Sequence, residues 1–267
     1  MKEMLYRRLS FIYFLFSIFF GLCFTGCESL GTYNTATGKK EFIFVPTSEE
    51  IALGTEIHQQ LLREYKMSQD AKRIETVNRI GGRLAQISDR QDYQYHFFLI
   101  EKDEQNAFTV PGGNVYIFTG LMDHLKTDDQ IAAVLAHEIG HCAAKHTIKK
   151  FQAALAYDLI GNIVMKSVKL DARTEQIAAM SSGALMNLVS SAYSRQDELQ
   201  ADRLGVKYMY LSGFDLIGMI ETLQILKTES KEGRAPLILR SHPYLDSRII
   251  AVKNEIMLVK DKYGERE

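Results

Sequence analysis

The sequence contains few cysteines and no surplus of charge of either sign. Only three cysteines occur in 267 residues, and two of them, Cys23 and Cys27, lie close together near the amino terminus, so a framework of disulfide bonds is excluded. Lys and Arg total 32 against 33 Asp and Glu, without a long basic block, which argues against nucleic-acid binding. Hydrophobic residues make up 46% of the chain, and this composition is typical of a globular protein.

The amino terminus has the features of an export signal. Lys2, Arg7 and Arg8 precede an uncharged stretch, residues 11–24, which is too short to span a bilayer comfortably. This stretch is typical of the hydrophobic region of a signal peptide. A cleaved signal peptide and an uncleaved signal anchor are the two alternatives, and both place the rest of the chain in an exported compartment.

The end of the hydrophobic stretch resembles a bacterial lipobox. Thr25 and Gly26 are small residues before Cys27, although Leu would be usual at the position of Phe24. We therefore expect residues 1–26 to be a lipoprotein signal peptide, with lipid on Cys27 holding the protein on a membrane of the cell envelope and facing the periplasm. Glu28, which is not an inner-membrane retention signal in the enterobacterial scheme, favours the outer membrane.

The remainder of the chain is predicted to form one folded domain. Residues 27–46 show little periodicity and are expected to be a tether between the lipid and a domain that covers residues 47–267. The segment from Thr47 to Glu50 has the Ser/Thr-x-x-Glu form of a capping box and predicts the start of a helix. A second helix is predicted over residues 71–87.

The middle of the domain changes to a strand pattern. Residues 93–101 and 114–118 are rich in aromatic and β-branched residues and predict a small antiparallel sheet, with a turn at residues 111–113. From Thr127 onward the pattern is helical almost to the end, so the fold class is α+β and mostly α-helical. Breaks in the helical pattern are expected near Gly161, Ser194, Gly213, Gly233 and Pro243.

One uncharged segment, residues 176–194, is long enough to raise the question of a transmembrane helix. Its Gln, Asn and Ser content lowers its hydrophobicity below that of a spanning helix. We therefore expect a buried or groove-lining helix in this segment.

A metal-binding motif lies in the helical region that begins at Thr127. His137, Glu138 and His141 match the pattern H-E-x-x-H. Residues four apart on an α-helix lie about 40° apart around its axis, so both imidazoles can face one ion. Glu138 is about 100° from His137 and therefore sits beside the ion as a candidate general base. Gly140, within the motif, indicates crowding near the metal.

A third ligand is required because a catalytic zinc site takes three protein ligands and keeps a position open. His146 would lie on the opposite side of a continuous helix, so we expect it to be a surface or capping residue. Glu198 is the better candidate, and Asp202, one turn further on, is placed to accept the free ring N–H of a ligating histidine. Asp197 points about 100° away from Glu198.

The acidic segment also has a simpler interpretation. A solvated acidic helix face, with Arg195 and Arg203 as ion-pair partners, is the usual explanation for such a charge cluster. The H-E-x-x-H motif upstream favours the metal-ligand interpretation instead. Cys142, next to His141, is about 100° off the metal face and has no second base, so we expect a small buried residue rather than a nucleophile.

Together these elements resemble the zinc metallopeptidase family that includes HtpX and the CAAX prenyl proteases, and within it the soluble periplasmic, BepA-like branch. The resemblance covers nearly all of the domain. It rests on residues 106–108, the hairpin at 111–120, the motif at 137–141, the helix at 198–202, and Ser241-His242-Pro243 followed by Arg248. It implies a gluzincin-type fold in which a small antiparallel sheet packs beside the active-site helix.

The resemblance also implies roles for individual residues. His137, His141 and Glu198 would bind one zinc ion, Glu138 would be the catalytic base, and Asp202 would support a ligand. His242 would occupy the open metal position and hold the enzyme shut, with a loop histidine that contacts backbone as the alternative. Arg248 would support the site or the transition state, with an ordinary ion pair as the alternative.

The implied function is a zinc-dependent endopeptidase that cleaves misfolded or unassembled envelope proteins. Residues 114–118 are a candidate edge strand for pairing with an extended substrate, with an ordinary internal hairpin as the alternative. A different class of function is a chaperone or assembly factor for outer-membrane proteins with a latent zinc site, which would make the outer-membrane assembly machinery a partner. A purely structural zinc site would leave Glu138 without a role.

Overall fold

The computed structural model describes residues 31–163, 187–231 and 235–264. The predicted signal peptide and Cys27 therefore lie outside the described residues, as does most of the predicted uncharged helix at 176–194. The described residues divide into two compact units, one containing residues 31–34 and Gly38–Ile43, and the other containing Thr35–Thr37 and the described residues from Phe44 onward.

The small unit contains a two-stranded hairpin. Strands β1 (Thr32–Asn34) and β2 (Lys39–Glu41) pair in antiparallel register, and the amide of Asn34 donates a hydrogen bond of 2.9 Å to the Glu41 carboxylate. Gly38 in the turn has φ of 68°, a conformation that favours glycine. Local structure is thus present in a segment where the sequence shows little periodicity, and the division into tether and domain stays a prediction.

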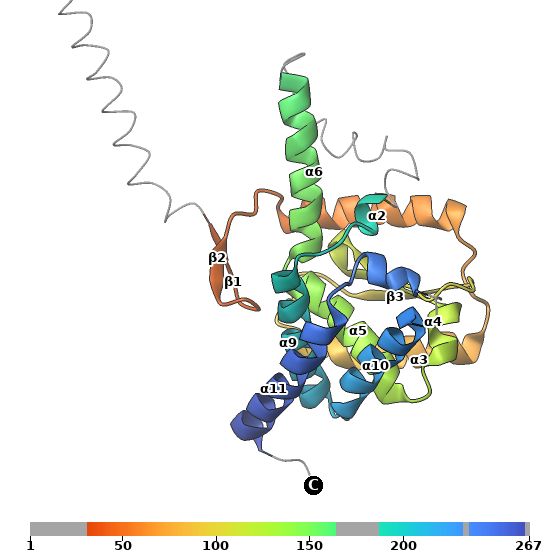
Figure 1. The fold of residues 1–267 in the computed structure, drawn as a ribbon. Coiled ribbons are helices and arrows are strands. Elements are labelled where there is room, and N and C mark those ends of the chain that lie inside the picture. Colours follow the sequence, from red (N-terminus) through yellow and green to blue (C-terminus); the bar gives the residue numbers. More distant parts are fainter. Residues whose placement is uncertain (1–30, 164–186, 232–234, 265–267) are drawn as a thin grey trace, which may run out of the picture. The chain divides into compact units, whose positions relative to one another are not determined.

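Helices make up most of the large unit (Figure 1). They are α2 (Thr47–Glu64), α3 (Ala71–Ile87), α4 (Thr119–His124), α5 (Asp128–Ala143), α6 (His146–Ile163), α9 (Arg195–Ser212), α10 (Ile217–Lys231) and α11 (Leu245–Tyr263), with short 3-10 turns η1 (Pro111–Gly113) and η2 (Leu237–Arg240).

The predicted helix ends are confirmed in part. The bounds predicted for α3 are confirmed, and the breaks expected near Ser194 and Gly213 coincide with the two ends of α9, where these residues are the caps. Gly161 does not break α6, which continues to Ile163. The expected break at Gly233 lies outside the described residues.

The capping box predicted at the start of α2 does not form. The helix begins at Thr47, but the hydroxyl of Thr47 donates to Asp92, with 2.6 Å between the oxygens. The carboxylate of Glu50 instead accepts hydrogen bonds from the buried guanidinium of Arg90. A buried arginine requires a carboxylate partner, and this requirement outweighs a local cap on an exposed turn.

The three-stranded sheet is mixed. Strand β5 (Asn114–Phe118) lies in the centre, antiparallel to β4 (Ala107–Val110) and parallel to β3 (His96–Ile100). The expectation of a wholly antiparallel sheet is therefore wrong for β3, because residue composition predicts strands but not the direction in which they pair. The tight η1 turn fixes only the β4–β5 pair.

The position of β5 also excludes it as the strand that pairs with a substrate. Both of its edges are occupied by neighbouring strands, and all five of its residues are buried. Among the described strands of this sheet, β3 and β4 form the edges, and β4 lies against α5.

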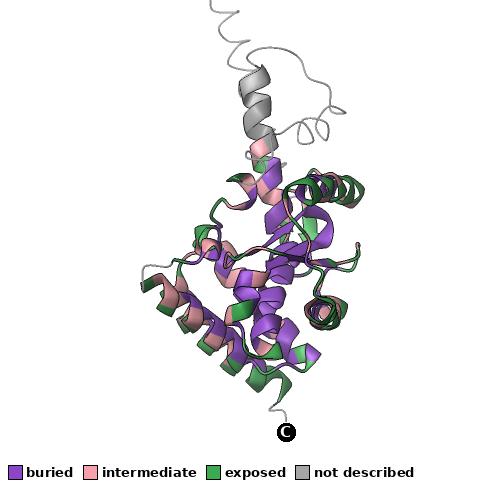
Figure 2. Cartoon of the chain, turned by 90° about the vertical axis from the view of Figure 1, so that its right-hand side faces the viewer, coloured by how far each residue is buried: buried purple, intermediate pink, exposed green. Residues whose placement is uncertain are grey.

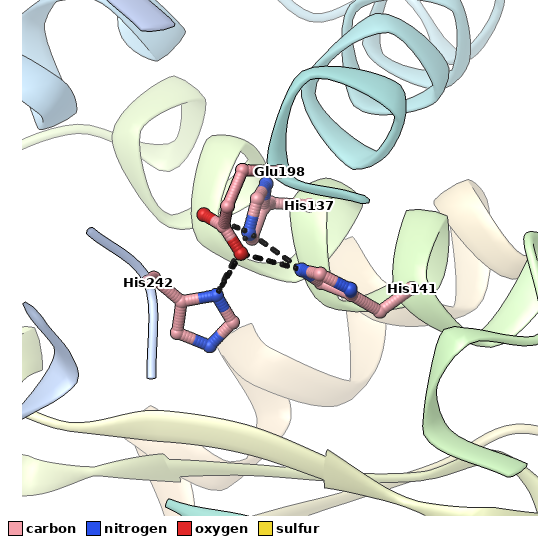
Figure 3. A group of neighbouring side chains, drawn as sticks. All are labelled: His137, His141, Glu198 and His242. Atoms are coloured by element: carbon pink, nitrogen blue, oxygen red, sulfur yellow. Dashed lines mark hydrogen bonds and ion pairs between the residues drawn. The ribbon is translucent and has the colours of Figure 1, made fainter. Parts of the chain in front are cut away.

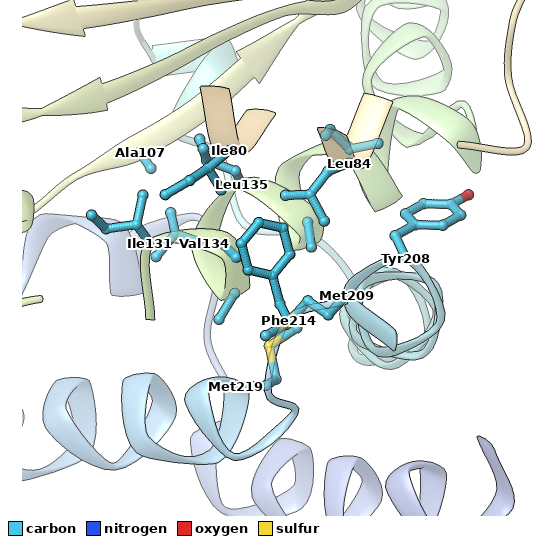
Figure 4. Packing of buried hydrophobic residues seen from close by; sticks show 14 of the residues in the cluster. Ile80, Leu84, Ala107, Ile131, Val134, Leu135, Tyr208, Met209, Phe214 and Met219 are labelled. Atoms are coloured by element: carbon cyan, nitrogen blue, oxygen red, sulfur yellow. The ribbon is translucent and has the colours of Figure 1, made fainter. Parts of the chain in front are cut away.

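Helix α5 is the centre of the large unit. Every residue from Gln130 to Ala143 is buried, and α5 contacts α3, α9, α10 and the sheet. Buried residues gather in the interior of the large unit (Figure 2). Apolar side chains from α3 and from the α9–α10 region pack around α5; they include Ile80, Leu84, Met209, Phe214 and Met219 (Figure 4). The pattern of α5 is apolar on all sides because it has neighbours on all sides.

Two glycines let α5 and α9 approach each other backbone to backbone. A Cβ added at Gly140 would lie 2.6 Å from the carbonyl oxygen of Ala201, and one added at Gly205 would lie 3.3 Å from the backbone nitrogen of His137. Gly140 was expected to relieve crowding near the metal, and the crowding comes from the backbone of α9.

None of the described helices combines the length and the apolar character that crossing a membrane requires.

We predict that Gly140→Ala lowers the free energy of unfolding by about 2–3 kcal/mol, because the added methyl group meets backbone that cannot rotate away. Urea denaturation measures the effect. Gly82→Ala in α3 is the matched control, since nothing lies within 4 Å of an added Cβ there and helix propensity should raise stability by about 0.5–1 kcal/mol. Similar responses of the two variants would contradict the close approach of α5 and α9.

Candidate metal centre

Helix α5 directs two imidazoles to the same side. Thr127 caps its amino terminus by accepting a hydrogen bond from the backbone of Gln130, and the helix runs unbroken through the H-E-x-x-H motif. His137 and His141 are therefore one turn apart, with their Nε2 atoms 3.1 Å from each other. Both side chains are buried, so their ring nitrogens face other protein groups rather than bulk water.

Helix α9 brings Glu198 to these imidazoles. Ser194 and Asp197 form a complete capping box that starts the helix, and Glu198 is the next residue. Its Oε1 atom lies 3.2 Å from Nε2 of His141, and its Oε2 atom lies 3.6 Å from Nε2 of His137 (Figure 3). The structure thus brings together the three residues that were predicted as metal ligands.

His242 approaches the same point from the segment between η2 and α11. Its Nδ1 atom lies 3.0 Å from Oε1 of Glu198 and 3.1 Å from Nε2 of His137 (Figure 3). Its Nε2 atom lies 3.4 Å from a carboxylate oxygen of Glu138. Tyr244 follows in a left-handed conformation with φ of 71°, which reverses the chain before α11 begins.

The four side chains form a donor set that suits a metal ion. His137, His141, Glu198 and His242 each offer one ligand atom, these atoms lie within 4.8 Å of one another, and all four residues are buried. Both carboxylate oxygens of Glu138 are buried beside them without a hydrogen bond. Converging imidazole nitrogens and a carboxylate oxygen are typical of zinc sites, and unpaired buried acceptors are costly without a cation or water.

The protonation states agree with metal binding. Burial lowers the pKa of His141 well below its usual value, against the opposing effect of Glu198, so the ring is neutral at pH 7. Burial raises the pKa of Glu198, but the positive charge of Arg248 and the neighbouring histidines outweigh it, and the net pKa lies well below its usual value. A neutral imidazole and an ionised carboxylate are the forms that ligate metals.

Asp202 and Arg248 contact the Nδ1 side of the His137 ring, away from the metal cluster. Oδ1 of Asp202 lies 2.8 Å from Nδ1 of His137, so the Nε2 atom of that ring is directed to the cluster. The guanidinium of Arg248 donates to both oxygens of Asp202 and lies 2.6 Å from Glu198. Although burial lowers the pKa of Arg248, the carboxylates of Asp202 and Glu198 raise it overall, and it remains a cation.

His146 was expected to be a surface or capping residue, and the expectation of a surface position is wrong. Its side chain is 1% exposed, and its Nδ1 atom lies 3.0 Å from Nδ1 of His141. A continuous helix would carry His146 to the opposite side, but α5 ends at Ala143 and Lys145 turns the chain with φ of 59° before α6 begins. His146 is thereby directed back toward His141.

Tyr193 and Lys150 are two further neighbours of the site that the sequence did not reveal. The ring of Tyr193 stacks on that of His141 with 3.9 Å between centroids. The ammonium of Lys150 lies 3.6 Å from the Tyr193 centroid and donates to the carbonyl of Ser191 at 2.7 Å. The sequence contains one indication that Tyr193 lies near the site, which is its position immediately before Ser194, the cap of the helix that carries Glu198.

The expectation for Cys142 is confirmed. Its side chain is buried, with Sγ 2.9 Å from the hydroxyl oxygen of Thr109. Burial raises the pKa of the thiol to about 12, so it is protonated at pH 7 and is not a nucleophile.

The fold and this site define a metallopeptidase domain. The model of Peptidase family M48 matches residues 71–256, and the chain belongs to this family. The matched region contains every residue of the cluster.

Similar proteins that carry a name are named as proteases, which agrees with the family assignment. The chain is similar to the beta-barrel assembly-enhancing protease of Escherichia coli (strain K12), with 29% identity over 213 residues that cover 77% of this chain and 43% of that protein. It is also similar to the mitochondrial metalloendopeptidase OMA1 of Schizosaccharomyces pombe, with 30% identity over 65% of this chain and 50% of that protein. Metalloprotease LoiP of Escherichia coli is 28% identical over 66% of each chain. The chain thus spans less than half the length of the first of these relatives.

We predict that Lys150 makes the stability of the protein depend on pH. Burial lowers the pKa of its ammonium from 10.5 to about 8, so above pH 8 the folded chain binds fewer protons than the unfolded chain. The stability contributed by Lys150 therefore rises with pH up to the unfolded pKa. Relative to Lys150→Met, the free energy of unfolding of the wild type should increase between about pH 7.5 and about pH 9.5.

Urea denaturation at the two pH values measures this difference. Lys126→Met changes an exposed lysine and is the control, with an expected difference from the wild type that is the same at both pH values. A difference in the free energy of unfolding between wild type and Lys150→Met that stays constant would show that the half-buried ammonium of Lys150 is not desolvated enough to lower its pKa.

Proposed function

We propose that the protein is a zinc-dependent endopeptidase. The observation that carries this proposal is the convergence of four buried ligand-type side chains beside a carboxylate, Glu138, that makes no hydrogen bond. A structural zinc site has no use for such a carboxylate, whereas a hydrolytic site requires a base at this position. Membership of a peptidase family supports the same conclusion.

His137, His141 and Glu198 are the proposed ligands of the catalytic metal. Zinc bound there supplies Lewis acidity, which makes water acidic enough to react at neutral pH and stabilises negative charge on a peptide carbonyl. The choice of zinc rests on the ligand types, since two imidazoles and one carboxylate are a common catalytic zinc set.

Glu138 is the proposed general base. It accepts a proton from the attacking water and then delivers it to the leaving nitrogen of the peptide. Its carboxylate is 1% exposed and receives no hydrogen bond, and Nε2 of His242 lies 3.4 Å from one of its oxygens. Arg248 and Asp202 are proposed to hold His137 and Glu198 in place, since the guanidinium contacts both carboxylates.

The proposed substrates are unfolded or unassembled polypeptides of the bacterial cell envelope. This part of the proposal rests on the lipobox-like sequence at Cys27 and on similarity to a protein named for enhancing beta-barrel assembly. We infer that the chain is anchored by lipid on Cys27, faces the periplasm and resides at the outer membrane. Incorporation of labelled palmitate that persists in Cys27→Ser would contradict the anchor.

An assembly function is the second candidate. The name of the first relative combines assembly with proteolysis, and the chain could assist outer-membrane protein assembly while its metal site stays latent. His242 gives this candidate a structural basis, because its ring lies against Glu138 and Glu198 at the position where a substrate would approach. The assembly machinery of the outer membrane is then the proposed partner.

We predict that Glu138→Gln lowers the cleavage of an unfolded substrate such as casein by about 10²–10⁴-fold, because the base is lost. Zinc content should be unchanged, since Glu138 is not one of the four clustered ligand groups. Glu75→Gln, on the exposed face of α3, is the control and should cleave like the wild type. Full cleavage by Glu138→Gln would overturn the proposed mechanism. Lost cleavage with an intact effect on envelope assembly in cells would favour the second candidate.

We predict that His242→Ala increases casein cleavage, because removal of the imidazole opens the space beside Glu138 and Glu198. Initial rates at saturating zinc measure the effect, and chelation should abolish the activity of both proteins. His124→Ala, at the end of α4, is the control. A fall in both cleavage and zinc content would instead identify His242 as a ligand that the active enzyme needs.

A further inference from the structure

The ring of His141 has a second nitrogen that the metal cluster does not use. Nε2 faces Glu198 and His137, whereas Nδ1 points to the other side, as Figure 3 shows. There it meets Nδ1 of His146 at 3.0 Å. Two ring nitrogens at this distance share one hydrogen, which belongs either to His141 or to His146.

The groups around His146 decide which ring carries that hydrogen. Nε2 of His146 lies 2.9 Å from Oε1 of Gln200 and 3.3 Å from Oδ1 of Asp197. An ionised carboxylate only accepts hydrogen bonds, so Nε2 of His146 carries a hydrogen. In a neutral imidazole the other nitrogen is then an acceptor. Nδ1 of His146 therefore accepts from Nδ1–H of His141, and Nε2 of His141 is left with a free lone pair.

We propose that His146 and Gln200 are positioning residues that fix the tautomer of His141 in the form that binds metal. The inference rests on the proposed function only in that Nε2 of His141 is taken as the ligand atom. It assigns a role to a buried histidine outside the H-E-x-x-H motif and to a glutamine two residues after Glu198.

The two histidines of the motif are supported in different ways. His137 has the carboxylate of Asp202 at 2.8 Å from its Nδ1 atom, whereas His141 has a neutral imidazole in the corresponding place. Partners of this kind raise metal affinity about 10–100-fold by orienting the ligand and fixing its tautomer. Tyr193 stacks on the ring of His141 and restricts its plane, so the hydrogen bond and the stacking together define one orientation.

The backbone between α5 and α6 makes the contact between His146 and His141 possible. Lys145 has φ of 59°, a conformation that costs a non-glycine residue about 1–2 kcal/mol, and it ends α5 just before His146. A continued α5 would carry residue 146 to a different side of the helix from the ring of His141. The break therefore places the imidazole of His146 behind His141.

The test compares two substitutions at the same position. In His146→Asn, Oδ1 lies as many bonds from the backbone as Nδ1 of histidine and keeps an acceptor for His141, whereas His146→Leu removes it. We expect His146→Leu to raise the dissociation constant for zinc about 10–100-fold. Competition with a chelating dye measures this constant. His146→Asn should recover most of the affinity. Gln200→Met, which leaves His146 in place, should weaken binding less than His146→Leu.

A second readout reports the tautomer directly. In ¹⁵N–¹H spectra of the zinc-loaded chain, His141 should carry its hydrogen on Nδ1, and this hydrogen should exchange with water faster in His146→Leu than in the wild type. Equal zinc affinity in His146→Leu and wild type, or affinity as poor in His146→Asn as in His146→Leu, would overturn the proposal. If His146→Leu does not fold, Gln200→Met decides, and unchanged affinity and exchange in that variant would also overturn it.

These measurements are separate from the test of the peptidase. Zinc affinity and hydrogen exchange do not depend on Glu138 acting as a base. A result that contradicts the peptidase proposal can therefore be told apart from a result that contradicts the role of His146. A purely structural role of His146 would change the stability of the metal-free chain in both variants and leave the zinc affinities of the folded proteins alike.

Discussion

The close contact between α5 and α9 is the constraint on which the site depends. Helices usually pack with their axes 8–10 Å apart, separated by side chains, and this spacing depends on the residues at the contact. Here Gly140 meets the backbone of Ala201, and Gly205 meets the backbone before His137. The same two helices carry His137, His141 and Glu198, so the fit of two glycines against backbone determines whether these side chains reach one another.

Charge balance is the second requirement of this arrangement. Glu138, Glu198 and Asp202 are three carboxylates buried within one small region, and Arg248 is the buried cation that contacts two of them. Burying charges is unfavourable unless they are paired and hydrogen-bonded. A divalent cation bound at the cluster would supply the remaining positive charge, so metal binding and the stability of the closed core are linked.

Sequence patterns predicted the parts of this structure that follow from local rules. The helix over residues 71–87, the breaks near Ser194 and Gly213, and the convergence of Glu198 on the H-E-x-x-H motif follow from periodicity and spacing. The pairing direction of β3 and the burial of His146 depend on contacts between segments and on one left-handed residue. Neither has a local sequence signal, because positive φ at a lysine is uncommon and strand composition does not encode direction.

The four clustered side chains come from three segments, with 105 positions between His137 and His242. As the polypeptide emerges from the ribosome, the pair of histidines therefore appears well before Glu198. A nascent chain at that stage has the two imidazoles of the motif but lacks the Glu198 carboxylate. The complete ligand set exists only where α9 has docked on α5, so closure of this helix pair and tight metal binding are coupled.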